Sequence, residues 1–347
     1  MVQLVYFLFF ILVFVQLLVE SSLISKKTSF YIYFLMLIPL MIFKDGSIMP
    51  DYYTYKGHYL NIINNEQILI EITFYIISLI FSYFQDEGYY FVLGVYSILH
   101  LILMHKFIEK NSPYYGYSML IYFVNFFIIF GLIQIRAGVA FGFILYGITR
   151  INEKKVFLKS IIAATFFHYS SFVFIILILL PKFKISRFKI YLFLSISFLV
   201  NKLLTPLMDF ILSVMPITYL EKKLITYTFA SRLERFEIDF FSPFILSKIL
   251  LLLIFSFFIE KISKAGNNSI IMLKMYLLGV CVYISLASFP DLAVRLSNML
   301  FISEIILLPY FISMFVQKKM IKTTLILFAF FMLYINVNFL SYFNYSL

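Results

Sequence analysis

The arginines of this 347-residue chain are the side chains whose type and position point most directly to chemistry. Two of the six lie in short basic segments, where lysine would anchor a membrane protein equally well. The other four lie on the side that the charge pattern assigns to the exterior: Arg136, Arg232, Arg235 and Arg295. A guanidinium on that side indicates planar, bidentate binding of an oxyanion. At a membrane surface, the natural oxyanion is the phosphate or pyrophosphate of a lipid-linked substrate.

Arg136 is the arginine without an acidic neighbour in the sequence. It stands between two apolar runs in Gly131–Ala140, and no acidic residue lies within fifteen positions of it. An ionisable group at the end of a span is costly, so the sequence favours a ligand over a local ion pair for this side chain. Arg232 and Arg235 lie beside three carboxylates, and for them pairing with acidic neighbours is the stronger interpretation.

Two further ionisable sites lie at the ends of expected helices. His168 interrupts the apolar segment Ala163–Ser171, where it could act on a substrate or equally well serve as a packing residue. Asp291 and Arg295 are four positions apart, so they could form a salt bridge on one helix face or bind a ligand. The sequence leaves these alternatives open.

The polar stretch Lys44–Glu71 combines tyrosines with carboxylates, among them Asp51, Tyr55 and Glu71. Aromatic faces stack on sugar rings and carboxylates accept hydrogen bonds from sugar hydroxyls, so this composition suits sugar recognition. An aromatic belt at the membrane interface would have the same composition. The two interpretations carry equal weight.

Composition places these residues in a membrane protein. Hydrophobic residues make up 63% of the chain and charged residues only 13%, compared with about a quarter charged in a soluble domain. Apolar stretches of roughly 15–22 residues match a hydrocarbon core of ~30 Å when they are helical. We expect an all-α polytopic integral membrane helical bundle of about 11–13 transmembrane helices, with Val2–Val19 retained as the first span.

The apolar pattern predicts helices at about residues 2–20, 29–43, 68–84, 88–107, 115–135, 137–151, 156–168, 170–181, 190–206, 244–260, 270–288, 296–316 and 323–341. The pair 156–168 and 170–181 is too short for two full crossings. It predicts either a re-entrant hairpin broken near His168 or one kinked span.

The net charge of +11 follows from topology. Of the 28 lysines and arginines, 18 lie in six short clusters, which the positive-inside rule places in the cytoplasm. We therefore expect a multi-pass protein of the bacterial cytoplasmic (inner) membrane. Its partner is expected to be the lipid bilayer, and no nucleic acid is expected to bind. Residues 1–347 are predicted to form a single transmembrane domain, with 44–66 as a polar loop and 207–243 as a long extracytoplasmic loop. Three helices are predicted between the basic clusters at 26–27 and 106–110, but an even number of crossings is needed to place both clusters in the cytoplasm. The sidedness of 44–84 is therefore left open.

Several site classes lack their sequence signatures. The chain contains no P-loop, dinucleotide fingerprint, HExxH or GxSxG motif, and Cys281 is its one cysteine. This pattern argues against ATP hydrolysis, hydride transfer and zinc proteolysis. We expect no cofactor and no metal site.

The motifs in their order resemble the EpsG-like branch of the Wzy-type O-antigen and exopolysaccharide polymerases. The resemblance covers about residues 45 to 315, and its most specific part runs from Arg136 to His168. The first motif is Asp-x-x-x-Tyr, matched by Asp51 and Tyr55, and a Glu that opens the next helix follows, matched by Glu71. An Ile-Arg-x-x-x-Ala element is matched by Ile135, Arg136 and Ala140, and an Ala-x-x-Phe-His-x-Ser element by Ala164, Phe167, His168 and Ser170. The last motif is an Arg before a span that ends in Leu-Pro, matched by Arg295, Leu308 and Pro309. Members often carry Gln after the Arg, where this chain has Ala137.

The resemblance implies a membrane glycosyltransferase that joins oligosaccharide repeat units carried on undecaprenyl pyrophosphate, at the outer face of the cytoplasmic membrane. Its other partners would be the chain-length regulator and flippase of the same pathway. The expected catalytic residues are Arg136, His168, Asp51 and Glu71, and the expected substrate-binding residues are Arg295, Asp291, Tyr55, Arg232 and Arg235. Arginine would stabilise the departing pyrophosphate, and the identity of the general base is left open among His168, Asp51, Glu71 and Asp291.

Two other functions fit the same features. A flippase or another transporter for lipid-linked oligosaccharide would differ in class, although transporters often show two pseudo-symmetric halves and this chain shows one helix break without a matching half. An O-antigen ligase would differ only in its acceptor.

Overall fold

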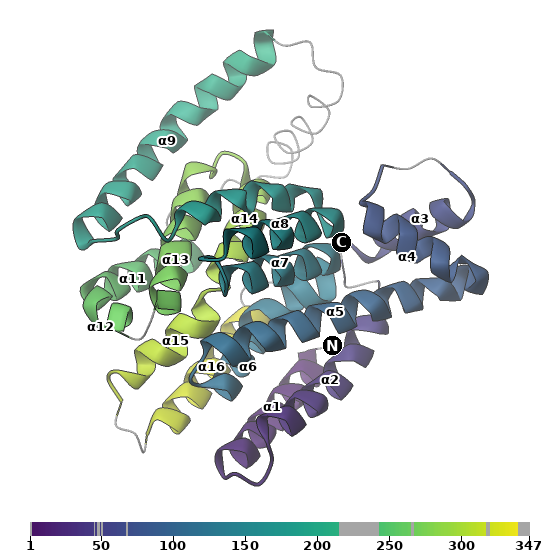
Figure 1. The fold of residues 1–347 in the computed structure, drawn as a ribbon, viewed down its shortest axis with the longest axis horizontal. Helices are drawn as coiled ribbons and strands as arrows, with labels where there is room; N and C mark the ends of the chain where they lie inside the picture. Colours follow the sequence, from purple (N-terminus) through teal and green to yellow (C-terminus); the bar gives the residue numbers. More distant parts are fainter. Residues whose placement is uncertain are drawn as a thin grey trace. The chain divides into compact units, whose positions relative to one another are not determined.

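The computed structural model describes residues 2–44, 46, 49, 51–66, 69–214, 243–264, 267–316 and 320–338 (Figure 1). Every regular element in these residues is helical, and no strand occurs among them. Several of the helices are long and apolar enough to span a membrane. The all-α membrane fold that the sequence predicts is therefore confirmed.

The described residues group into two compact units, Met1–Ile178 with Leu308–Leu347, and Leu179–Leu307. The expectation of a single transmembrane domain stays a prediction. The helices of the first unit are α1 (Val2–Glu20), α2 (Lys26–Ile42), α3 (Tyr52–Ile63), α4 (Ile72–Phe81), the 3₁₀-helix η1 (Ser82–Glu87), α5 (Gly88–Asn111), α6 (Tyr115–Tyr122), the π-helix η2 (Phe123–Ile133), α7 (Ile135–Ile148), α8 (Lys154–Phe167), the 3₁₀-helix η3 (Tyr169–Leu179) and α16 (Ile321–Asn338). The second unit contains α9 (Arg187–Val214), α11 (Pro243–Phe257), α12 (Ile259–Lys264), α13 (Asn267–Ser285) and α14 (Pro290–Phe301), and α15 (Glu304–Ser313) begins in it.

Four helical segments of the described chain are long and apolar enough to cross a membrane: Ile72–Asn111, Tyr115–Ile133, Asn268–Ser285 and Ile321–Asn338. A fifth candidate joins Leu292–Phe301 to Glu304–Ser313 across a bend of 48°. Four shorter apolar helices accompany them. These long segments account for fewer crossings than the predicted 11 to 13, because α2, α7, α8, η3 and α11 each have fewer than the 18 residues required of these candidates.

Part of the polar stretch 44–66 is helical, so its prediction as a loop is wrong for α3. The buried residues of α3 recur every three or four positions, which places them on one helix face: Tyr52, Tyr55, Tyr59 and Ile62. Three of these four are tyrosines, so the side chains that composition assigns to sugar binding or a membrane interface form a packing face instead. The hydroxyl of Tyr59 donates to the backbone oxygens of Phe81 and Gln85, at 3.2 and 2.5 Å. These bonds connect α3 to the end of α4 and to η1, which lies between α4 and α5.

The first unit packs around α7, which contacts α5, α8 and η2. A Cβ on Gly138 would lie 2.2 Å from the carbonyl oxygen of Phe130, so only glycine permits this approach of α7 to η2. The backbone leaves helical geometry at Gln134 (φ −96°, ψ 59°), and Arg136 therefore falls in the first turn of α7. The buried side chain of Lys44 donates a hydrogen bond of 2.6 Å to the carbonyl of Leu132 and satisfies an acceptor near this break.

The predicted break at His168 is present. Helix α8 ends at Phe167, His168 adopts an extended conformation (φ −159°, ψ 111°), and η3 begins at Tyr169. The break places the imidazole directly after the carboxyl end of α8.

The second unit contains a buried ion pair between residues 56 positions apart in the sequence. The Lys248 Nζ lies 2.6 Å from Glu304 Oε1, and the two side chains are 8% and 0% exposed. The ammonium also lies 5.3 Å from the ring centre of Phe244 and 5.1 Å from that of Phe301. Glu304 begins α15, immediately after the bend in the fifth candidate span. Lipid could not solvate a carboxylate at this position, so the ammonium of Lys248 compensates its charge.

Replacing Lys248 by Met would leave the charge of Glu304 buried without its partner. We expect the free energy of unfolding to fall by about 3–5 kcal/mol, as measured by thermal or denaturant unfolding of the purified protein in detergent. Adding Glu304→Leu should restore most of the loss, since both charges are then gone. A single variant with wild-type stability would contradict a structural role for the pair.

Candidate active site

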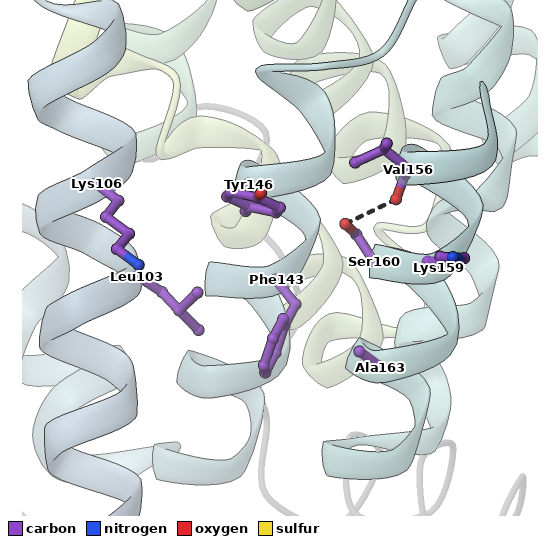
Figure 2. Close-up of a pocket in the computed structure, with 8 residues that line it drawn as sticks. All are labelled: Leu103, Lys106, Phe143, Tyr146, Val156, Lys159, Ser160 and Ala163. Atoms are coloured by element: carbon purple, nitrogen blue, oxygen red, sulfur yellow. Dashed lines mark hydrogen bonds between the residues drawn. The ribbon is translucent and has the colours of Figure 1, made fainter. Parts of the chain in front are cut away.

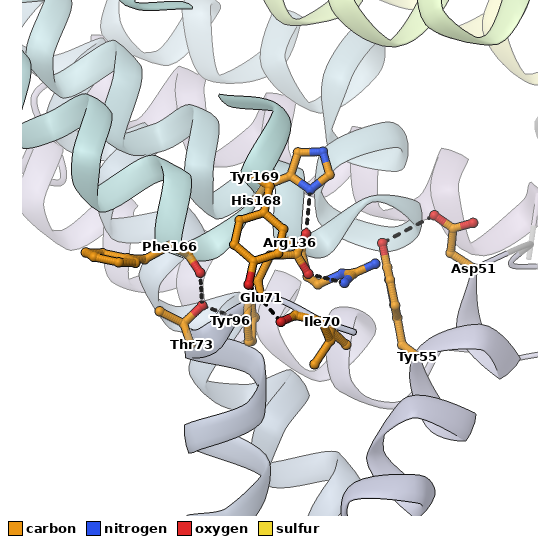
Figure 3. Close-up of polar contacts among 10 residues, drawn as sticks. All are labelled: Asp51, Tyr55, Ile70, Glu71, Thr73, Tyr96, Arg136, Phe166, His168 and Tyr169. Carbon is orange, nitrogen blue, oxygen red and sulfur yellow. Dashed lines mark hydrogen bonds and ion pairs between the residues drawn. The ribbon is translucent and has the colours of Figure 1, made fainter. Parts of the chain in front are cut away.

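A buried carboxylate joins three segments that are far apart in the sequence (Figure 3). Glu71 precedes α4, Arg136 lies in the first turn of α7, and His168 follows α8. Oε2 of Glu71 accepts a hydrogen bond from Nη1 of Arg136, and Oε1 lies 3.1 Å from Nδ1 of His168. The three side chains are 7%, 16% and 27% exposed, respectively. We call them the Glu71–Arg136–His168 cluster.

Helix α3 supplies a second support for the arginine. The guanidinium carbon of Arg136 lies 4.6 Å from the ring centre of Tyr55 and 5.8 Å from that of Phe74, in cation–π geometry. The hydroxyl of Tyr55 donates to Oδ2 of Asp51 at 3.3 Å. Tyr55 is only 4% exposed, so its ring orients Arg136 and leaves little surface for a sugar. Asp51 therefore joins the cluster through Tyr55.

Two hydrogen bonds to backbone carbonyls lock the segments on both sides of the Glu71–His168 contact (Figure 3). The hydroxyl of Tyr169 donates to the carbonyl of Ile70 at 2.9 Å, and that of Thr73 donates to the carbonyl of Phe166 at 2.7 Å. These bonds fix the residues before and after Glu71 against those before and after His168.

The environment of Glu71 favours its ionised form. Burial alone would raise the pKa of this carboxyl, but the hydrogen bond from His168 and the charge of Arg136 together hold the pKa below its usual value of 4.5. The carboxylate consequently remains charged at neutral pH and keeps both partners.

The same carboxylate defines the tautomer of His168. An ionised Glu71 can only accept, so the proton of a neutral imidazole lies on Nδ1 and the lone pair on Nε2. Figure 3 shows Nε2 pointing away from Glu71. With the side chain 27% exposed, this nitrogen is available to accept a proton from a substrate.

A second histidine, His58, belongs to the same electrostatic neighbourhood and was not among the predicted site residues. Burial lowers its pKa, the charge of Arg136 lowers it further, and the charge of Glu71 raises it. It lies on α3, one turn after Tyr55. The sequence signal for His58 is its spacing of three positions from Tyr55, which places both residues on one side of a helix. This spacing is informative only once α3 is known to be a helix.

The described structure brings together five of the predicted site residues: Asp51, Tyr55, Glu71, Arg136 and His168. The sequence favours a ligand over an ion pair for Arg136. The structure corrects this prediction, because Arg136 pairs with Glu71. Its partner lies 65 positions earlier, and a search of neighbouring positions therefore missed it.

The other four predicted residues stay predictions. Arg295 is an exposed residue of α14 in the second unit. The side chain of Asp291 lies outside the described part of the structure, and so do Arg232 and Arg235. Among the residues that the structure describes, no three His, Cys, Asp or Glu side chains are arranged to hold a metal ion.

Comparison with known protein families gives a match over most of the chain. The model of the EpsG family matches residues 30–347, which include the whole Glu71–Arg136–His168 cluster. No protein with a curated description and no solved structure matches the chain.

The lowered pKa of Glu71 predicts a defined pH dependence of stability. A carboxyl group whose folded-state pKa is depressed stabilises the fold above its unfolded-state pKa, and this contribution is lost as the pH falls through the lower folded-state value. We expect the difference in melting temperature between the wild type and Glu71→Gln to be present at about pH 6 and to shrink below about pH 4.5. Thermal unfolding of both proteins in detergent between these limits and pH 3 measures it. A difference that stays constant down to pH 3 would contradict the ion pair.

Proposed function

The chain belongs to the EpsG family of polysaccharide-polymerase-like membrane proteins, and we propose that it polymerises lipid-linked oligosaccharide units at the outer face of the bacterial cytoplasmic membrane. The donor would be a growing chain on undecaprenyl pyrophosphate, and the acceptor a hydroxyl at the non-reducing end of the next lipid-linked unit. The bond between the anomeric carbon and the pyrophosphate oxygen breaks, and a bond from that carbon to the acceptor oxygen forms. Undecaprenyl pyrophosphate leaves, and the hydroxyl proton passes to a base.

The observation that carries this proposal is the position of the Glu71 carboxylate between His168 and Arg136. It supports His168 Nε2 as the base that accepts the hydroxyl proton, since Glu71 holds the imidazole in the required tautomer. Glu71 also stabilises the imidazolium that forms. Glu71 is in this mechanism a positioning residue, and His168 is the residue that contacts the acceptor.

Arg136 is proposed to stabilise the charge that develops on the departing pyrophosphate. Its Nη1 is held by Glu71 and one ring contact is made by Tyr55, yet 16% of the side chain is exposed. A guanidinium fixed in this way can present its accessible N–H groups, which do not include the buried Nε, to phosphate oxygens without reorganising. Such preorganisation is the basis of electrostatic stabilisation. Because the paired carboxylate cancels the charge of Arg136, a further cation would strengthen this interaction.

An exposed aromatic ring next to the cluster suits the sugars of the repeat unit. Tyr169 of η3 directly follows His168 and is 50% exposed. The Tyr169 hydroxyl is already bound to the carbonyl of Ile70, which fixes the ring beside His168. We propose that this ring, rather than the buried Tyr55, contacts a sugar.

Deletion of the gene and complementation with variants tests the function directly. We expect His168→Gln to abolish the ladder of polysaccharide lengths on electrophoresis and to leave single repeat units, because each polymerisation step needs the base; the rate should fall by about 10²–10⁴-fold. His105→Gln, the same change at a histidine of α5 that pairs with Glu109 outside the cluster, is the matched control and should retain a ladder. Loss of all repeat units from the surface in the deletion strain would indicate a flippase or a ligase instead.

Arg136→Lys tests the oxyanion role. Lysine keeps the charge and can still pair with Glu71, but it offers only a point charge in place of a planar fork. We expect shortened chains or none at a wild-type protein level, measured by the same electrophoresis with an immunoblot of the membrane fraction. Arg187→Lys, an exposed arginine of the second unit, should have no effect. A wild-type ladder from Arg136→Lys would contradict the assignment.

A further inference from the structure

A hollow lies at the other end of α7 from the Glu71–Arg136–His168 cluster. Its volume is about 400 Å³, and it lies over α7 between α5 and α8 (Figure 2), lined by Leu103, Lys106, Phe143, Tyr146, Val156, Lys159, Ser160 and Ala163. Tyr146 follows Arg136 by ten positions, which is about 15 Å along a helix. The hollow is therefore separate from the candidate active site.

Two close helix contacts create this hollow. A Cβ on Gly142 would lie 2.8 Å from Cβ of Leu103 on α5, and a Cβ on Gly147 would lie 2.8 Å from Cβ of Ser160 on α8. The glycines thus hold both neighbouring helices against the sides of α7. Phe143 and Tyr146 lie between these two contacts and form the floor of the hollow (Figure 2).

The lining combines apolar walls with cations. Lys106 and Lys159 reach it from opposite walls, and both are exposed. The guanidinium of Arg150 lies 5.7 Å from the ring centre of Tyr146 and adds a third positive charge. None of the eight lining residues is acidic. Glu109, one turn after Lys106, contacts His105 at 3.7 Å instead.

These features together define the ligand chemistry. A free phosphate would gain nothing from Leu103, Phe143, Val156 and Ala163, and a neutral lipid would gain nothing from the three cations. An amphiphile with an anionic head and an apolar chain uses both parts of the lining. Lys106, Arg150 and Lys159 also belong to the basic clusters that the positive-inside rule assigns to the cytoplasm, where anionic head groups attract such residues.

We propose that the hollow formed by α5, α7 and α8 binds an anionic glycerophospholipid of the cytoplasmic leaflet, with its phosphate on Lys106 and Lys159 and part of an acyl chain on Phe143. This site is independent of the reaction assigned to the cluster above.

The absence of tryptophan from the chain gives a clean test. Tyr146→Trp introduces a single tryptophan into the floor of the hollow, which is excited at wavelengths that tyrosine does not absorb. The full-length protein is placed in nanodiscs that contain brominated phosphatidylglycerol or brominated phosphatidylcholine. We expect half-maximal quenching at about a tenfold lower mole fraction of the anionic lipid. Adding Lys106→Gln with Lys159→Gln should abolish this preference.

The matched control is Lys154→Gln with Lys155→Gln, which removes two exposed charges from the same helix without touching the lining. It should retain the preference, and an equal loss in the control would reduce the effect to surface potential and overturn the site. Equal quenching by both lipids, or displacement of the brominated lipid by millimolar inorganic phosphate, would overturn it as well. Native mass spectrometry of the unlabelled protein and the Lys106→Gln, Lys159→Gln variant checks the result without the tryptophan. Retained phosphatidylglycerol should be lost only in the variant.

Discussion

The desolvated carboxylate of Glu71 is the interaction on which the candidate site depends. A buried charge is costly unless it is paired and hydrogen-bonded, and Glu71 meets this condition with one partner on each oxygen. Since Arg136 and His168 come from α7 and from the end of α8, the charge can be satisfied only when three separate segments converge. Tyr55 contacts Arg136 from α3, so a fourth segment must converge with these three. The carboxylate therefore couples the packing of the first unit to the geometry of its chemistry.

Breaks in the helices are the structural means of this convergence. Glu71 has extended backbone before α4, Gln134 leaves helical geometry before α7, and His168 is extended after α8. Membranes tolerate non-helical backbone only where protein or a water-filled cavity satisfies its polar groups. Here the bonds from Tyr169 and Thr73 to backbone carbonyls meet that need. The π-helix η2 before Gln134 fits the tendency of such elements to mark functional sites.

Sequence reasoning reached the features that depend on local pattern. The all-α membrane class follows from hydrophobic runs, the break at His168 from polar residues inside one such run, and the family from short motifs around Arg136 and His168. It missed what depends on contacts between distant residues. The partner of Arg136 lies 65 positions away, the face of α3 is built from tyrosines, and the pairing of Lys248 with Glu304 joins residues 56 positions apart. The hollow beside Tyr146 depends on two glycine contacts whose partners no periodicity reveals.

A double-mutant cycle on Glu71 and Arg136 tests the central claim that they act as one unit. The rate of polymerisation of purified lipid-linked repeat units in proteoliposomes would be measured for the wild type, Glu71→Gln, Arg136→Gln and the double variant. Residues that act together are strongly non-additive, so the double variant should be about as slow as the slower single variant. A double variant whose loss equals the product of the two single losses would contradict a shared role for the pair.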